Sequence, residues 1–259
     1  AIVQSHATAD IKGNSRHICE LMTQDRDVGA GLNTFLKRLY PDMSNHRVQT
    51  EGPWIGMRLK TGGSTFGKRR ANLGYGLLQI VIIEWRGPTD RATACSSSLQ
   101  GKLITSYDKR YCSHSDITDW YWAGHHANIF SIDGFRIDCA LCIEIQLPEV
   151  FRQYEQLDVD CVVFSAFCDD PMFWTQARGD AGTNNLWGSV TTPAQFGTAV
   201  QSGLIGPHGY GLARCEAKMT AQLLRVELDK KSPDLHVALT KARPWRCKAR
   251  SRDIYKTDP

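Results

Sequence analysis

Short apolar runs separated by polar or glycine-rich stretches predict alternating strands and helices along this chain. Residues 2–4, 29–35 and 77–85 are apolar runs of strand length, and Gly87-Pro88 ends the last of them. Residues 10–27 carry apolar side chains at three- and four-residue steps, which predicts a helix between the first two strands.

The alternation continues through the rest of the chain, where strand-like segments surround a helix that begins at Pro148. Strands alternating with helices indicate an α/β fold. We therefore expect one large α/β domain over residues 1–240, followed by a basic tail over 241–259. The helix is expected over 148–157, and the strands over 102–106, 128–132, 135–141, 159–165 and 223–228.

Length and composition agree with one soluble globular domain. A chain of 259 residues can bury a substantial core, and 42% hydrophobic with 22% charged residues is ordinary for such a domain. The net charge of +4 predicts no acidic partner, and no apolar run approaches the roughly 20 residues of a membrane helix. The first residues lack the pattern of a secretory signal, and nine cysteines are too sparse for a disulfide scaffold. We expect reduced thiols and a cytoplasmic location.

The end of the chain is basic, and such a run could bind nucleic acid. Only Trp245 and Tyr255 offer rings on which bases could stack. A solvated tail that packs on a subunit partner is therefore the favoured interpretation, and nucleic acid the disfavoured one. The cations are Lys241, Arg243, Arg246, Lys248, Arg250, Arg252 and Lys256.

Cys142 ends the apolar strand Phe135–Leu141 and precedes Pro148-Glu149, which can open a helix. Sheet proteins place reactive groups at such strand ends. A free cysteine is more often inert packing, and for Cys142 taken alone that ordinary interpretation stays open.

Several neighbouring segments strengthen the functional interpretation. Gly101-Lys-Leu103 leads to Tyr107-Asp-Lys109 in the pattern G-x-L-x-x-x-Y-x-K, and residues 141–149 fit I-C-Y/E-D/E-x-x-F-P-E. Together these segments resemble the nitrilase (carbon–nitrogen hydrolase) superfamily, over about residues 1–255 and specifically from Gly101 to Leu228. Further matches follow in order at Gly124, Phe130-Ser-Ile-Asp-Gly134, Arg152, Asn184-Asn185-Leu-Trp187 and Ser202-Gly-Leu-Ile-Gly-Pro-His-Gly209.

The resemblance implies a four-layer α-β-β-α sandwich and a cofactor-free hydrolase of a small amide or nitrile. Such a reaction needs a nucleophile, a base and positive charge on the developing oxyanion. By motif, Cys142 is the nucleophile, Lys109 the oxyanion partner and the backbone N–H of Ile143 a second oxyanion donor. A lysine beside a thiol also favours the reactive thiolate.

One position departs from the superfamily pattern. Where its members carry a general-base Glu, after the second strand, this chain has Lys37. A protonated lysine cannot accept a proton, and general-base help is typically worth about 10²–10⁴-fold in rate. A further family carboxylate corresponds to Asp116, one methylene shorter, while Glu144 matches a residue with a local positioning role.

Other candidate positions are assigned less specifically. The resemblance implies a substrate pocket shaped by His125, Phe167, Trp174 and Asn184, although core packing explains the two aromatic residues equally well. Cys112-x-His114 with His125-His126 lacks a second well-spaced pair, and Cys139 and Cys142 would point to opposite faces of a strand. Gly62–Lys68 has phosphate-loop spacing without the following Ser or Thr. We expect no metal and no cofactor.

Two functional hypotheses remain. The first is a hydrolase of a small amide that forms a Cys142 thioester, impaired by loss of the base. The second is a catalytically inactive homologue that keeps the fold for ligand binding or assembly. By resemblance, a homodimer or higher homo-oligomer would form through the helix after Pro148 and the basic tail, with no membrane partner.

Overall fold

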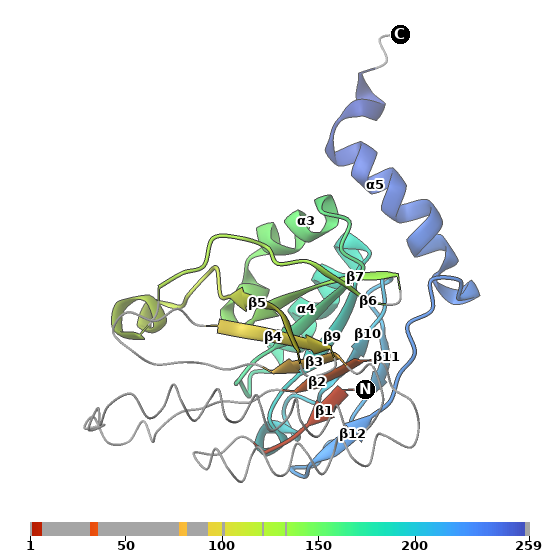
Figure 1. Cartoon of the computed structure of the whole chain (residues 1–259). Coiled ribbons are helices and arrows are strands. Elements are labelled where there is room, and N and C mark those ends of the chain that lie inside the picture. Colours follow the sequence, from red (N-terminus) through yellow and green to blue (C-terminus); the bar gives the residue numbers. More distant parts are fainter. Residues whose placement is uncertain are drawn as a thin grey trace.

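The structure of the chain, a computed structural model, describes residues 2–6, 32–35, 78–81, 93–99, 102–120, 122–132 and 134–256. These residues form two six-stranded sheets, which face each other with helices on the outer face of the second (Figure 1). Strands β1 and β2 of the first sheet contact β9 of the second, and β4 contacts β7. The described part of the chain is therefore an α/β structure built on two packed sheets.

The first sheet collects strands from the start, the middle and the end of the described chain. Its centre is parallel, because β1 pairs with β2 and β2 with β3 in that sense, and the outer pairs are antiparallel. Its strand order is β12 (Gln222–Leu224), β1 (Ile2–Gln4), β2 (Leu32–Phe35), β3 (Leu78–Val81), β4 (Thr93–Leu99) and β5 (Lys102–Asp108).

The second sheet repeats this plan, with a parallel centre between antiparallel edges. The last residues of its parallel strands lie side by side, since Leu141 pairs with Ser165 and Ser165 with Thr191. Residues that follow these strands therefore gather at one edge of the sheet. The strand order is β11 (Gly211–Arg214), β10 (Gly203–Ile205), β9 (Trp187–Thr191), β8 (Cys161–Ser165), β7 (Phe135–Leu141) and β6 (Phe130–Ile132).

Helices α3 (Pro148–Gln156) and α4 (Met172–Asn184) cover the outer face of the second sheet. Pro148 fits the first turn of α3, where its missing N–H costs no intrahelical bond. Short or irregular helices complete the described chain: η1 (Asp116–Trp120), η2 (Cys142–Gln146), η3 (Ala194–Phe196), η4 (Pro233–Leu235), η5 (Val237–Ala242), α5 (Arg243–Arg250) and η6 (Asp253–Tyr255).

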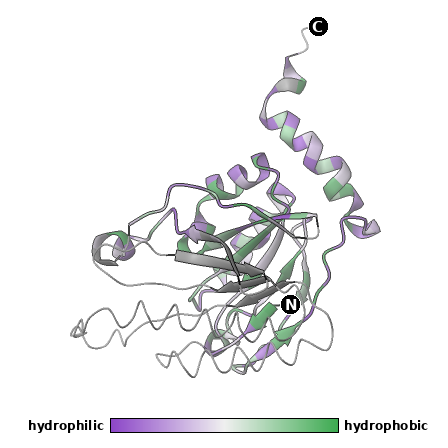
Figure 2. Ribbon diagram, viewed as in Figure 1, coloured by the Kyte–Doolittle hydropathy of each residue, from purple (hydrophilic) through white to green (hydrophobic). Residues whose placement is uncertain are grey.

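Side chains of β7 alternate between two cores, as the period of a strand requires. Cys139 and Leu141 join the cluster between the sheets, together with Ile2 and Tyr107 from the first sheet. Ala140 faces α3 and α4 in a second cluster. Figure 2 shows hydrophobic residues concentrated in the strands of the second sheet.

Most predicted elements are confirmed. The strand expected over 223–228 is shorter, at Gln222–Leu224, and the predicted helix over 10–27 lies outside the described residues. Two face-to-face sheets and one outer helical layer are described, and these are three of the four expected layers.

Within the expected basic tail, residues 243–250 form α5, which also bonds to residues of the domain. The unpredicted β4, α4, β9, β10 and β11 complete the sheets and their cover. Among the described residues, no helix has both the length and the apolar character needed to cross a membrane.

Candidate active site

Cys142 occupies a strained backbone position directly after β7. Its φ is 49°, in the left-handed region that L-residues with a side chain rarely adopt. Leu141 ends the strand with extended geometry, and η2 begins at Cys142, so the chain turns sharply at the thiol. The Cys142 side chain is half-buried. Strained backbone of this kind clusters at active sites, where the surrounding structure holds it in place.

Glu144 holds this turn against the segment that follows β5. Its carboxylate is fully buried and accepts hydrogen bonds from the backbone N–H groups of Leu141 at 2.7 Å, Arg110 at 2.7 Å and Tyr111 at 3.1 Å. The hydroxyl of Tyr107 lies 2.9 Å from both carboxylate oxygens. Burial raises the pKa of Glu144, and these hydrogen bonds to its oxygens oppose the rise.

These contacts bear on the chemistry available to Glu144. Four donors occupy its two oxygens, and the side chain has no exposed surface. A general base must reach the proton that it removes, directly or through one water. The geometry therefore favours a positioning role for Glu144, joining the turn at Cys142 to residues 107–111.

Lys109 lies on this joined segment and pairs with Asp116. Its ammonium is 2.6 Å from the Asp116 carboxylate, and only 5% of the Lys109 side chain is exposed. Burial would raise the pKa of Asp116, but the hydrogen bond from Lys109 and its charge, with help from Ser113, hold the pKa below its usual value. Asp116 is therefore ionised at neutral pH and fixes the position of the Lys109 ammonium.

The loop that carries His125 lies against the backbone of Lys109. The N–H of Gly124 donates to the Lys109 carbonyl at 2.7 Å. A Cβ atom on Gly124 would lie 2.5 Å from the carbonyl oxygen of Asp108, so only glycine allows this close approach. His125 and His126 are exposed, with ring centroids 6.3 Å apart.

Arg110 is a buried cation that the sequence motifs did not single out. Its guanidinium lies 5.0 Å from the ring centroid of Tyr154, donates to the Tyr107 hydroxyl at 3.2 Å and bonds to Gln153. The neighbouring Tyr154, Tyr107 and Glu144 raise the pKa of Arg110 although burial opposes the charge. Arg110 therefore links residues 107–111 to α3. The sequence signal that could have indicated Arg110 is its position directly after the motif residue Lys109.

The other predicted pocket residues lie outside this network of hydrogen bonds. Phe167, just after β8, packs edge-on against Phe196 at 4.9 Å between centroids. Trp174 is buried on α4 with the Arg214 guanidinium 4.1 Å from its ring. Asn184 ends α4 and accepts from Arg250 at 3.0 Å, close to α5.

Two further predicted positions are the second oxyanion donor and the general base. Ile143 is the second residue of η2, so its N–H belongs to the turn at Cys142. Lys37, which the sequence motifs predict at the position of the general base, lies outside the described residues. In the described ranges, no group of three or more His, Cys, Asp or Glu side chains could hold a metal ion.

Comparison with known proteins gives a structural likeness. Protein-family models and curated proteins show no match to this sequence. The structure is similar to an amidase from Nesterenkonia sp., at 15% identity and TM-score 0.69, over 85% of this chain and 87% of that chain. It is also similar to the NitN amidase from strain AN1, at 16% identity and TM-score 0.72, over 96% of this chain and 97% of that chain.

A third similar structure is the glutamine-dependent NAD+ synthetase from Acinetobacter baumannii, at 15% identity and TM-score 0.65, over 83% of this chain and 43% of that chain. The AN1 amidase is described as a member of the nitrilase superfamily. In one of its mutants, the acetamide moiety of fluoroacetamide is covalently added at the active-site cysteine. The described chain therefore has the α/β fold found in amidases of the nitrilase superfamily.

Proposed function

We propose that this protein is a carbon–nitrogen hydrolase that acts on a small amide through a thioester on Cys142. The observation that carries the proposal is the strained turn at Cys142, with φ 49°, bonded through Glu144 to the segment of Lys109. Backbone strain costs free energy, and here a buried carboxylate with hydrogen bonds to both oxygens maintains it. Packing alone does not require such strain, which is typical of a preorganised site.

The reaction would proceed in two steps, formation of a thioester and its hydrolysis. The Cys142 thiolate attacks the amide carbonyl carbon, the C–N bond breaks, and the nitrogen leaves as ammonia after taking up a proton. Water then attacks the thioester, the C–S bond breaks, and the carboxylic acid and the thiol are released. In both steps a negative charge forms on the carbonyl oxygen and needs a fixed positive partner.

Lys109 and the N–H of Ile143 are the proposed oxyanion donors. Lys109 suits the role because its ammonium is almost fully buried and held at 2.6 Å by Asp116. A charge fixed before the reaction needs little reorganisation as the oxyanion forms, which is how such donors lower a barrier. His125 lies on the loop bonded to Lys109 and is proposed to border the entrance for the substrate.

The proton acceptor of the reaction is the group for which this chain departs from the superfamily pattern. Lys37 stands where the superfamily has a carboxylate, and an ammonium cannot take the thiol proton. Glu144 is occupied by four donors, which argues against it as a substitute. A second candidate function follows, in which the protein keeps the fold for ligand binding or assembly and does not turn over.

Ammonia release from a panel of small amides separates the two candidates. The hydrolase predicts slow turnover that disappears in Cys142→Ala. It also predicts that fluoroacetamide treatment leaves a carbamoylmethyl thioether on Cys142, detectable by mass spectrometry, as the thiolate displaces fluoride. The inactive homologue predicts no turnover in the parent protein.

Lys37→Glu is the informative companion variant, because it returns a carboxylate to the aligned base position. A rise in turnover of about 10²-fold or more would support the assigned site and its missing base. If neither the parent nor Lys37→Glu turns over any amide, and no adduct forms on Cys142, the hydrolase proposal fails. Cys247→Ala is the control, because it removes an exposed thiol on α5, outside the hydrogen-bonded segments of Lys109 and Cys142.

We also propose a homodimer in the cytoplasm as the working form. Cys112, Cys161, Cys168, Cys215 and Cys247 are free thiols, which supports a reducing location. Sedimentation at several concentrations tests the dimer, and a monomer throughout would contradict it.

A further inference from the structure

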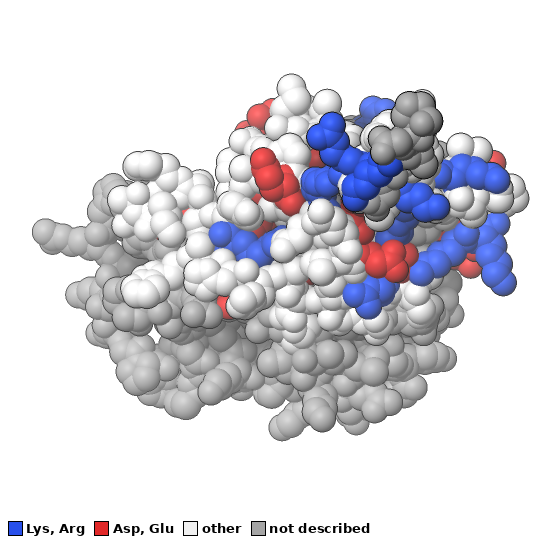
Figure 3. Space-filling view, turned by 90° about the horizontal axis from the view of Figure 1, so that it is seen from above, with Lys and Arg blue, Asp and Glu red and all other residues white. Residues whose placement is uncertain are grey.

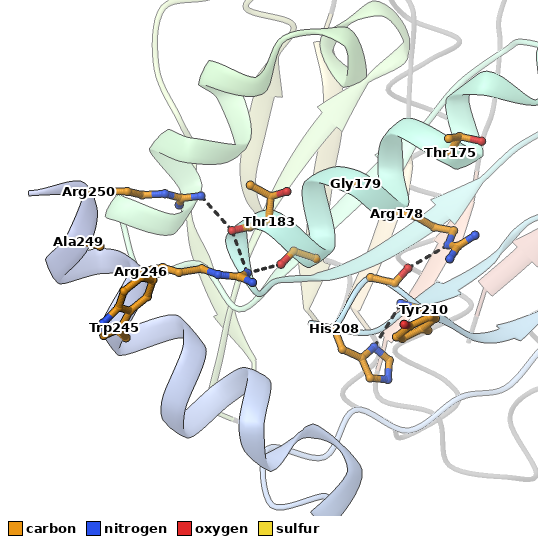
Figure 4. Close-up of a pocket in the computed structure, with 12 residues that line it drawn as sticks. Thr175, Arg178, Gly179, Thr183, His208, Tyr210, Trp245, Arg246, Ala249 and Arg250 are labelled. Atoms are coloured by element: carbon orange, nitrogen blue, oxygen red, sulfur yellow. Dashed lines mark hydrogen bonds between the residues drawn. The ribbon is translucent and has the colours of Figure 1, made fainter.

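Asp138 is a fully buried carboxylate of β7 that pairs with no cation of the described residues. Lys and Arg gather instead on the surface around α5 (Figure 3). There Arg246 and Arg250 bond to carbonyl oxygens at the end of α4 (Figure 4). Buried charges are normally paired, so the hydrogen-bond partners of Asp138 indicate what this carboxylate does.

The partners of Asp138 are two backbone N–H groups. One oxygen accepts from Cys139 in β7 at 2.7 Å, and the other accepts from Asn128 at 2.9 Å. Asn128 belongs to the loop before β6, and β6 runs antiparallel to β7 with Phe130 opposite Ile137. The residues before β6 therefore lie toward the end of β7 that leads into the proposed nucleophile. The Asp138 carboxylate fastens this loop to β7.

Residues 124–128, here named the entrance loop, are also fastened at their other end. The N–H of Gly124 donates to the carbonyl of Lys109 at 2.7 Å. Between the two hydrogen bonds, Ala127 packs against the cluster between the second sheet and its helices, and Cys142 packs against the same cluster. Both histidines of the loop are exposed. The entrance loop thus lies beside both proposed catalytic residues, with a hydrogen bond at each end.

We propose that Asp138 is a positioning residue for the entrance loop and that protonation of its carboxylate loosens this loop. The role rests on the function proposed above, in which His125 borders the entrance for the substrate. An ionised carboxylate offers an acceptor to both N–H groups, whereas the protonated oxygen of a carboxylic acid is a donor. Hydrogen bonds to a charged acceptor are also about twice as strong as neutral ones. Protonation should therefore weaken the bond to Asn128 and with it the binding of substrate.

Charged groups from each neighbouring element act on this carboxyl. Burial raises the pKa of Asp138 from 3.8 to about 6, and the two N–H donors oppose the rise. Arg110, after β5, also lowers this pKa, whereas Glu144, in η2, raises it. Tyr154 faces the carboxyl from α3, and the entrance loop itself carries two titratable histidines. The charge of Asp138 therefore changes in mildly acidic solution.

Protonation of Asp138 has two effects of opposite sign. The neutral acid relieves the cost of burying a charge, so acid favours the folded state as a whole. The same protonation removes a strong acceptor from the N–H of Asn128. A carboxyl with a purely structural role would move stability and loop order in one direction. The positioning role instead predicts a fold that gains stability in acid while its entrance loop loosens.

Nuclear magnetic resonance of the isotope-labelled full chain tests the hydrogen bond directly. Because the amide of Asn128 donates to Asp138, its resonance should shift between pH 7.5 and 4.5 with a midpoint near pH 6. The shift should vanish in Asp138→Asn and persist in the double variant His125→Gln with His126→Gln. At pH 7.5 the amide of Gly124 should exchange about fivefold faster in Asp138→Asn than in the parent. A parent resonance without a shift would overturn the proposal even if Asp138→Asn fails to fold.

Steady-state ammonia release tests the effect on the substrate, with Lys37→Glu as the background if the parent is too slow. Asp138→Asn should raise KM about fivefold at pH 7.5, leave kcat nearly unchanged, and match the parent near pH 5. Asp160→Asn is the matched control, because this buried carboxylate accepts from the N–H of Arg136 at the other end of β7, at 2.8 Å. It should keep the KM of the parent at both pH values.

Equal increases of KM in Asp138→Asn and Asp160→Asn would overturn the proposal, because they would show a general effect of losing a buried carboxylate. An increase in Asp138→Asn that is the same at pH 5 and pH 7.5 would overturn the role of protonation. Absence of turnover in both the parent and Lys37→Glu would reject the hydrolase. The resonance of Asn128 and the exchange of Gly124 would then decide the role of Asp138 without any reaction.

Discussion

The hydroxyl of Tyr107 lies 2.9 Å from both carboxylate oxygens of Glu144, and both side chains are almost fully buried. Tyr107 belongs to β5 of the first sheet, and Glu144 belongs to the turn after β7 of the second. One hydrogen-bonded pair therefore fixes the two sheets to each other beside Cys142 and Lys109. The relative position of the proposed nucleophile and oxyanion partner depends on this pair.

Glu144→Gln should disrupt this junction. A glutamine has one acceptor oxygen, and its NH2 group would face N–H donors that now meet a carboxylate. We expect a loss of about 3 kcal/mol in the free energy of unfolding, because buried donors lose their partners. Urea denaturation measures it. Glu149→Gln, at an exposed position in the first turn of α3, should change stability by less than about 0.5 kcal/mol. Equal stability of the two variants would contradict the positioning role.

Local pattern predicted the central strands well, because each carries a signal within its own residues. The run Phe135–Leu141 is confirmed residue for residue as β7, and Pro148 begins α3 as its preference for a first turn indicates. The motif residues Tyr107, Lys109 and Glu144 could be named from the sequence.

The contacts of Glu144 with residues 107–111 could not be predicted from local pattern, because they join positions 33 to 37 residues apart. The burial of Arg110 and the φ of 49° at Cys142 follow from how the two sheets pack, and neither has a local signature. Helix α4 was missed because it contains glycines and polar residues that favour other structures, while tertiary packing of Phe173 and Ala177 supports it.

The basic segment near the end of the chain also makes contacts that its own sequence does not predict. Its charges predicted a solvated tail, yet carbonyl and carboxylate acceptors at the ends of α3, β8 and α4 bind three arginines of α5. Those acceptors lie about 60 to 95 positions earlier in the chain. Charge composition alone cannot show which cations find such partners.

The strained backbone at Cys142 gives a second prediction. At this position a glycine variant should be more stable than an alanine variant, the reverse of the usual order of stability. Glycine adopts positive φ without the clash that any Cβ introduces. Cys142→Gly should therefore be more stable than Cys142→Ala, by about 1 kcal/mol. Thermal and urea unfolding of the two variants measure the difference.

Ala140 provides the comparison, because it lies two residues earlier, inside the buried strand β7. Ala140→Gly should lower stability by about 1 kcal/mol, the ordinary direction for glycine in a strand. If glycine also destabilises position 142 relative to alanine, the turn is not strained in solution.

Asp116→Asn should reduce amide turnover through Lys109. The change removes the carboxylate that holds the ammonium at 2.6 Å, so the proposed oxyanion donor loses its fixed position. We expect kcat/KM to fall by about 10²-fold with KM nearly unchanged, as misplacement of a catalytic group does. Steady-state ammonia release measures both constants. Asp234→Asn, at an exposed position, should keep parent activity.

The same pair predicts a pH profile. Because its pKa lies below the ordinary value of about 3.9, Asp116 stays ionised as the pH falls from 7 to 5. The Lys109–Asp116 pair should therefore add no acidic limb to kcat/KM in that range. A limb that is present in the parent and absent in Asp116→Asn would show that the carboxylate titrates there.

Asp138 should make the stability of the protein depend on pH. Its carboxylate is fully buried in β7 and accepts from the N–H groups of Cys139 and Asn128, at 2.7 Å and 2.9 Å. Burial raises the pKa of Asp138 from 3.8 to about 6. Between these values the folded protein binds more protons than the unfolded chain, so the contribution to stability is complete below pH 3.8 and lost as the pH rises through 6.

Asp138→Asn removes this titration. Relative to the parent, the variant should be more destabilised at pH 4.5 than at pH 7.5, by roughly 2 kcal/mol. Urea denaturation at the two pH values measures it. Asp158→Asn, at an exposed carboxylate, should show a difference that changes little with pH. A constant difference for Asp138→Asn would mean that this carboxyl is not protonated in the folded protein near pH 4.5.

Arg250 should be required for docking of α5. Its guanidinium reaches Glu155, whose side chain is only 3% exposed, and also bonds to Asn184 and to the Thr183 carbonyl. Arg250→Met would keep much of the apolar stem but leave the Glu155 carboxylate buried without this cation. Breaking a buried ion pair from one side typically costs about 3–5 kcal/mol, and relaxation of α5 near the surface should keep the cost at the lower end.

Hydrogen exchange distinguishes local release of α5 from a global loss of stability. In Arg250→Met, we expect amides of residues 243–250 to exchange faster at a denaturant concentration where those of β8 stay protected. Arg252→Met removes an exposed cation from the next turn and should leave both sets unchanged. Because Arg250 faces the domain and Arg252 faces solvent, opposite outcomes are expected for two arginines separated by one residue. Equal exchange in the two variants would mean that α5 is held by its other contacts and that Glu155 relaxes toward water.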